Sequence, residues 1–115
     1  ALAGGPEDGP EVGFFEGSYE LVGRGPGGTL VAEKMALRVD GEGLAAEGCG
    51  GEAGALAWAR VHESWELVGR VFGTEVSCGY SVDAGNYPIL NCLGPEGVRL
   101  TAWPEGEFGL ALACE

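Results

Sequence analysis

The chain has 115 residues, with 6 Lys or Arg against 18 Asp or Glu, so its formal net charge is −12. This excess of acids argues against binding to nucleic acid or to an anionic membrane surface, because both require a basic face. No apolar run approaches the roughly 18 residues of a transmembrane helix. Three Trp, three Tyr, four Phe and four Cys favour a packed core in one folded domain.

The first 16 residues are rich in glycine and proline, which predicts a flexible leader. Phe14 and Phe15, at its end, are expected to cap one end of the folded domain. Ala1-Leu2-Ala3 has the small-x-small pattern that precedes a signal-peptidase cut, so we expect that a signal peptide has been removed.

A segment of the chain repeats itself 46 residues later. Tyr19-Glu20-Leu21-Val22-Gly23-Arg24 recurs as Trp65-Glu66-Leu67-Val68-Gly69-Arg70. Four further matches stay in order with nearly the same offset, among them Cys49 with Cys92 and Trp58 with Trp103. An ordered series of matches indicates an internal repeat. We predict two diverged units, spanning about 18–63 and 64–108.

Each unit has the alternating pattern of four short strands separated by turn residues. The predicted strands are Tyr19–Arg24, Met35–Val39, Leu44–Cys49 and Ala55–Arg60, then Trp65–Arg70, Thr74–Val82, Tyr87–Leu93 and Val98–Trp103. Asp40-Gly41-Glu42-Gly43 is typical of a tight turn. A final strand, Phe108–Ala113, falls where a third copy of the first strand would begin.

Eight or nine antiparallel strands at this spacing predict an all-β sandwich or barrel. We favour a small eight- to nine-stranded barrel over residues 17–115, because two separate four-stranded sheets would leave edges exposed. The strand at 108–113 is expected to close the barrel by pairing with the first strand.

The even number of cysteines in a small acidic domain favours two disulfides and an oxidising compartment. Buried free thiols and a zinc site are the alternatives, although the chain has no Cys-x-x-Cys pair and His62 is its only histidine. A turn centred near Gly85 would place Cys78 opposite Cys92. The remaining pair, Cys49 and Cys114, would then tie the closing strand to the first unit. Two other pairings of the four residues remain open.

Catalytic and cofactor motifs are scarce. His62 lies between the two units, where a linker is expected, and the serines carry no nucleophile-elbow motif: Ser18, Ser64, Ser77 and Ser81. Carboxylate pairs such as Glu105 and Glu107 follow from an acid-rich composition. We therefore predict no enzyme activity and no catalytic residue.

Two glycine-containing segments resemble ligand loops only in part. Asp40-Gly41-Glu42 could open a calcium loop, but Gly51 stands where an EF-hand has its twelfth-position acid. The segment Gly23–Gly28 lacks the Lys-Ser/Thr and the helix of a phosphate loop. We expect a hairpin turn and a plain loop, with no bound metal or cofactor.

Trp58, Trp65 and Trp103 fall within predicted strands. Core packing is the expected role of all three. A position facing a ligand at the end of the barrel is the alternative.

The segment from Leu37 to Gly50, Leu-Arg-Val-Asp-Gly-Glu-Gly-Leu-Ala-Ala-Glu-Gly-Cys-Gly, resembles the central signature of META/HslJ-like domains. Tyr19-Glu20-Leu21-Val22 and Trp65-Glu66-Leu67-Val68 are similar to the Trp-x-Leu opening of that family. Gly50 and Gly51 stand where the family has asparagine. The chain is also similar to periplasmic protease-inhibitor β-barrels. These resemblances imply a small envelope or secreted β-domain without catalysis.

Three functional hypotheses follow. The first is a non-enzymatic exported or periplasmic domain that binds another protein, as an inhibitor or an envelope-stress component. The second is a lipocalin-like barrel that binds a small molecule. The third, an enzyme, is the least supported. The net charge favours a basic protein as the partner, although solubility in a saline habitat would also explain the acidity.

Overall fold

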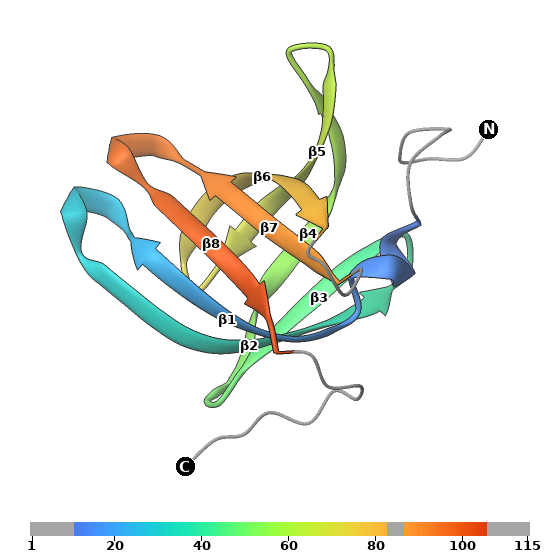
Figure 1. Cartoon of the computed structure of the whole chain (residues 1–115), viewed down its shortest axis with the longest axis horizontal. Helices are drawn as coiled ribbons and strands as arrows, with labels where there is room; N and C mark the ends of the chain where they lie inside the picture. The colour runs from blue at the N-terminus through green and yellow to red at the C-terminus, as the bar shows by residue number, and fades with distance from the viewer. Residues whose placement is uncertain (1–10, 83–86, 106–115) are drawn as a thin grey trace.

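A computed structural model describes residues 11–82 and 87–105, and these residues form one closed antiparallel β-barrel (Figure 1). Its eight strands follow chain order around the barrel: β1 (Gly17–Arg24), β2 (Leu30–Asp40), β3 (Gly43–Gly48), β4 (Gly51–Val61), β5 (Ser64–Val71), β6 (Thr74–Val82), β7 (Pro88–Leu93) and β8 (Arg99–Pro104). The helical segments among the described residues are three short 3-10 turns: η1 (Val12–Phe15), η2 (Pro26–Gly28) and η3 (Pro95–Gly97). No helix in this part of the chain is long and apolar enough to cross a membrane.

Closure of the barrel is made by β8. This strand pairs antiparallel with β1 from Tyr19 opposite Pro104 to Arg24 opposite Arg99. The all-β barrel architecture predicted from the sequence is confirmed, and the closing role expected of the strand at 108–113 belongs to β8 instead. Residues 108–113 lie outside the described part of the chain. The two copies of the repeated hexapeptide form β1 and β5, and the duplication of whole four-strand units stays a prediction.

Tight two-residue turns join four of the hairpins: β2–β3, β3–β4, β4–β5 and β5–β6. The β2–β3 hairpin closes with Asp40 opposite Gly43, as the turn chemistry of that segment predicts. The β4–β5 turn consists of His62 and Glu63, with φ values of 50° and 72°. Hairpin turns of this length favour a positive φ because its twist matches that of the flanking strands. His62 is therefore a turn residue, which fits its predicted place between the two halves of the sequence.

The interior of the barrel is filled by side chains. Alternate residues of each strand point inward, and those that are fully or almost fully buried include Tyr19, Leu21, Met35, Leu37, Leu44, Leu56, Leu67, Val76, Leu90 and Leu100. An eight-stranded barrel has an interior just wide enough for such side chains. The described part of the molecule is thus a packed core, and any ligand has to bind toward one of its ends or on its surface.

The 3-10 turn η1 closes one end of the barrel. Phe15 has no exposed surface, and its ring packs edge-on against Trp58 and Tyr80 at centroid distances of 5.8 and 5.3 Å. The buried Tyr19 hydroxyl donates a hydrogen bond of 2.7 Å to the Phe15 carbonyl. The sequence predicted a flexible leader over residues 1–16, whereas residues 12–15 are a structured part of the domain. Residues 1–10 lie outside the described part.

One disulfide is present between described residues. Cys78 on β6 and Cys92 on β7 lie directly opposite each other and are bonded, as the predicted hairpin required. Cys49, at the end of β3, is also disulfide-bonded. Its predicted partner, Cys114, lies outside the described residues, so the Cys49–Cys114 pairing stays a prediction.

Candidate functional site

The end of the barrel opposite η1 carries the turns that follow β1, β3, β5 and β7; we call it the open end. Two of these turns have the same sequence pattern, Gly-Pro-x-Gly, at residues 25–28 and 94–97. Both form 3-10 turns closed by a backbone hydrogen bond from the first glycine, Gly25 to Thr29 and Gly94 to Val98. The turns η2 and η3 are in contact, so they form one continuous rim (Figure 1).

The β5–β6 turn forms the facing rim. It consists of Phe72 and Gly73, and Phe72 has a φ of 48°. The left-handed region is uncommon for a bulky residue, and such positions are held by their surroundings. The Phe72 amide donates a hydrogen bond of 2.7 Å to the carbonyl of Ala53. A Cβ atom on Gly48 would lie 2.7 Å from Phe72 Cε1, so the absence of a side chain at Gly48 makes room for the ring.

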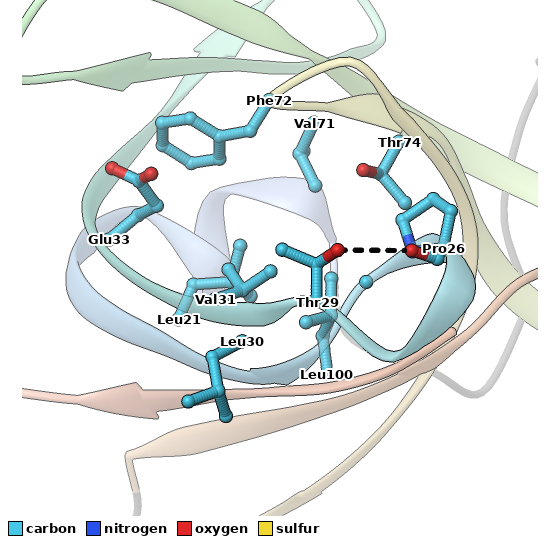
Figure 2. A pocket seen from close by; sticks show the side chains of 11 residues that line it. Leu21, Pro26, Thr29, Leu30, Val31, Glu33, Val71, Phe72, Thr74 and Leu100 are labelled. Carbon is cyan, nitrogen blue, oxygen red and sulfur yellow. Dashed lines mark hydrogen bonds between the residues drawn. The ribbon is translucent and has the colours of Figure 1, made fainter. Parts of the chain in front are cut away.

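Between the two rims lies a hollow of about 340 Å³ (Figure 2). Its deepest walls are the core residues Leu21, Val71 and Leu100, and its sides include Pro26, Leu30 and Phe72. Glu33 is the one charged side chain among the residues that line it. Small-ligand sites in proteins typically have volumes of roughly 300–1,000 Å³ and mostly apolar walls with a few polar groups. The hollow has this composition and lies at the lower limit of this range.

A second hollow of about 400 Å³ adjoins the first. It is lined by the glycine-rich β3–β4 turn, by Glu52 and by the β5–β6 turn. Glu33 and Phe72 line both hollows and therefore form the wall between them. A carboxylate next to an aromatic ring is a favourable place for a cation, since the ring face adds a cation–π attraction to the ion pair.

Two arginines near this rim are directed at their own turns. Arg24 donates a hydrogen bond of 3.1 Å to the carbonyl of Gly28, and Arg70 makes the equivalent bond to Gly73. The side chain of Glu33 has no hydrogen bond or ion pair with the part of the chain that the structure describes. The carboxylate at the wall of the hollow is therefore available to a ligand.

The candidate residues singled out in the sequence lie elsewhere. Asp40, Gly41 and Glu42 form the end of the β2–β3 hairpin, at the plugged end of the barrel, and His62 is in the β4–β5 turn at the same end. Within residues 11–82 and 87–105 no three His, Cys, Asp or Glu side chains gather as metal ligands would. Ser77 donates a hydrogen bond to Glu66, and neither residue lines the two hollows described above.

The three tryptophans have different environments. Trp58 is in the core, where its ring contacts Phe15 and its buried Nε1–H has no acceptor among the described residues. Trp65 is half-buried, with the Arg60 guanidinium 5.7 Å from its ring centroid. Trp103 is 50% exposed, so its predicted place in the core is wrong. It lies three residues after the buried Leu100, and an odd spacing along a strand puts two side chains on opposite faces.

Sequence reasoning missed Glu33 and Phe72, although each had a signal. Glu33 occupies an inward position between Val31 and Met35, and a charged residue on the core side of a strand is unusual. Phe72 precedes Gly73 in a two-residue interval between strands, where asparagine or aspartate is more common. The hollow itself had no sequence signal because its walls come from five separate strands and two turns.

Comparison of the chain with protein-family models, with curated proteins and with solved structures finds no match in any of the three. The resemblance to META/HslJ-like domains and to protease-inhibitor barrels therefore stays a prediction.

Proposed function

We propose that the protein is a non-enzymatic, exported binding domain that takes a basic side chain of a partner protein into the hollow at its open end. The observation that carries this proposal is the composition of the hollow, whose walls are mostly apolar, with the hydroxyls of Thr29 and Thr74 and a single charged group, the carboxylate of Glu33. A lysine or arginine side chain has a matching chemistry, with an apolar stem and a charged end.

The partner's side chain would enter between the two rims. Its stem would pack against Pro26 and Val31, and its charged group would reach Glu33 beside the Phe72 ring. The net charge of −12 supports the same polarity at longer range, because it attracts a basic protein before contact is made. Export is proposed from the Cys78–Cys92 disulfide, since such bonds persist in oxidising compartments. An inhibitor or an envelope-stress component would have these properties.

A test uses the ¹⁵N-labelled full chain and the peptide acetyl-Ser-Leu-Lys-Leu-Ser-amide, with norleucine in place of lysine in the control peptide. We expect the lysine peptide to shift the backbone amides of residues 25–33 and 71–74. The Glu33→Gln variant should bind it about tenfold more weakly, because a charge-assisted hydrogen bond contributes about 1.5–3 kcal/mol. Glu63→Gln makes the same change in net charge at the opposite end of the barrel and should alter the affinity less than about twofold.

Equal effects of Glu33→Gln and Glu63→Gln would contradict the proposal, since they would show that only long-range attraction operates. Shifts centred away from the open end would contradict it as well.

The volume of the hollow favours a second candidate, the binding of a small apolar molecule. An uncharged dye such as Nile red distinguishes the two. If the hollow serves an apolar ligand, dye binding should survive Glu33→Gln and weaken in Phe72→Ser, and the lysine and norleucine peptides should bind equally.

A further inference from the structure

The outer surface of four neighbouring strands, β7, β8, β1 and β2, carries no carboxylate in the two rows of residues nearest the open end. Its outward-facing residues form three rows, which we call the β7–β2 face: Leu93, Arg99, Arg24 and Leu30; then Asn91, Thr101, Val22 and Ala32; then Ile89, Trp103, Glu20 and Lys34. In a chain with 18 acids, the carboxylate of this face is Glu20 in the third row, where it lies between Trp103 and Lys34. The two rows nearest the open end therefore carry two positive charges and no negative charge on an otherwise acidic molecule.

The row nearest the open end has an unusual arrangement. Leu93, Arg99, Arg24 and Leu30 lie opposite one another in register across the four strands. The two leucines are 57% and 72% exposed, and they flank two arginines that are direct cross-strand neighbours. Like charges in this position repel each other, so the pair disfavours folding. Arg99 makes no hydrogen bond or ion pair with the described residues that would relieve this repulsion.

The repeated hexapeptide supplies an internal comparison. Its second copy ends in Arg70, which, like Arg24, donates a hydrogen bond to the carbonyl of its own turn. On the neighbouring strand Arg70 has Glu75 as its cross-strand partner. Arg24 has Arg99 in the β1–β8 pair and Leu30 in the β1–β2 pair, so no carboxylate stands directly opposite it. The same motif thus has a carboxylate on the neighbouring strand at β5 and none at β1.

We propose that the β7–β2 face binds a short segment of another protein in which a carboxylate lies between apolar side chains. The two guanidinium groups bind the carboxylate, and the leucines and Trp103 take the flanking side chains. Arginine and tryptophan are among the residue types that dominate binding energy at interfaces. Guanidinium groups bind carboxylates in a fixed, bidentate geometry, which adds specificity.

The size and charge of the face indicate whether it binds a whole domain, a second copy of this chain or a short segment of another protein. Four strands span about 15 Å across, and three rows of outward residues extend about 14 Å along them. This is much smaller than the roughly 800 Å² that each partner buries in a stable complex of two domains. The net charge of −12 also opposes a second copy of this chain. A short segment with a single carboxylate in a different protein fits both facts, because one negative charge is repelled far less than a second chain of net charge −12.

The probe for this proposal is the peptide acetyl-Ser-Thr-Leu-Glu-Leu-Thr-Ser-amide, titrated into the ¹⁵N-labelled full chain. Its matched control carries glutamine in place of glutamate. We expect the glutamate peptide to shift the backbone amides of residues 22–24 and 99–101 and to bind more tightly than the glutamine peptide. The Arg99→Gln variant should weaken binding about tenfold or more, as expected for the loss of a charge-assisted hydrogen bond.

Arg70→Gln is the matched variant, because Arg70 occupies the corresponding position of the hexapeptide and has Glu75 opposite it. It should change the affinity by less than about twofold. Equal binding of the two peptides, or equal effects of Arg70→Gln and Arg99→Gln, would overturn the proposal. Self-association in sedimentation experiments that Arg99→Gln abolishes would also overturn it, since the occupant would then be a second copy.

Discussion

Replacing Phe15 by alanine tests whether η1 is an integral part of the barrel. Burying a phenylalanine removes roughly 150–250 Å² from water. At about 25 cal/mol per Å² this corresponds to about 4–6 kcal/mol. Alanine keeps part of that burial, and measured Phe→Ala substitutions in cores cost about 3–5 kcal/mol. Because Phe15 has no exposed surface and contacts both Trp58 and Tyr80, we expect a loss within that range.

Phe14 is the matched control, since it is the same residue type one position earlier and is 39% exposed. Its ring makes edge contacts with Phe15 and Tyr80, which are worth about 0.5–1.5 kcal/mol each in general. Phe14→Ala should therefore cost clearly less than Phe15→Ala. The measurement is urea unfolding followed by far-ultraviolet circular dichroism, with the slope compared between variants to verify that the unfolded states are alike.

Similar losses for the two variants would refute this reasoning, because they would show that Phe15 is no more buried in solution than Phe14. A domain of this size has a total stability of about 5–15 kcal/mol. Phe15→Leu retains most of the side-chain volume and provides a measurable value if the alanine variant does not fold.

Three further predictions concern charge, titration and the disulfide. Arg99→Glu should raise the free energy of unfolding by about 0.2–1 kcal/mol in urea titrations, because it replaces the repulsion with Arg24 by an attraction. Burial raises the pKa of Tyr19 above its ordinary value of 10.0, so the folded state holds that proton more tightly than the unfolded chain. Stability is therefore expected to fall as the pH rises above 10.0, and to fall less in Tyr19→Phe when both proteins are unfolded at a series of alkaline pH values. Joint replacement of Cys78 and Cys92 by alanine should cost about 3 kcal/mol by calorimetry, the value expected for a closed loop of about 15 residues.

The sequence predicted those features that depend on local pattern. Period-two alternation located all eight strands, although β2 begins at Leu30, five residues before its predicted start at Met35. The first part of β2, before Met35, contains Glu33. This charged residue interrupts the apolar alternation, so that part of the strand was not recognised from the sequence. The pairing of Cys78 with Cys92 was also predictable, because the distance of each residue from the turn determines the register of a hairpin.

Features that depend on distant segments were not predictable in the same way. The closing partner of β1 was assigned to residues 108–113, because nothing local distinguishes β8 as the strand that returns to β1. Trp103 was wrongly predicted to lie in the core because it is the repeat counterpart of Trp58. The number of residues that separates each tryptophan from the buried leucine before it was not taken into account. Leu56 and Trp58 are two residues apart and share the core face, whereas Leu100 and Trp103 are three apart. A one-residue change in spacing moves a side chain through the sheet.

The repeated motif shows how one sequence serves both the fold and the surface. A Cβ atom on Gly23 would lie 2.2 Å from the carbonyl oxygen of Arg99, and one on Gly69 would lie 1.9 Å from that of Ala55. These close approaches of neighbouring strands accompany the strong curvature of a small closed barrel, and only glycine permits them. The arginine that follows each glycine is exposed, and no such steric requirement acts on it. At β5 it faces an acid, and at β1 it faces another arginine. The geometry of the barrel therefore explains the glycines, and the Arg24–Arg99 pair requires a different explanation, for which binding is our proposal.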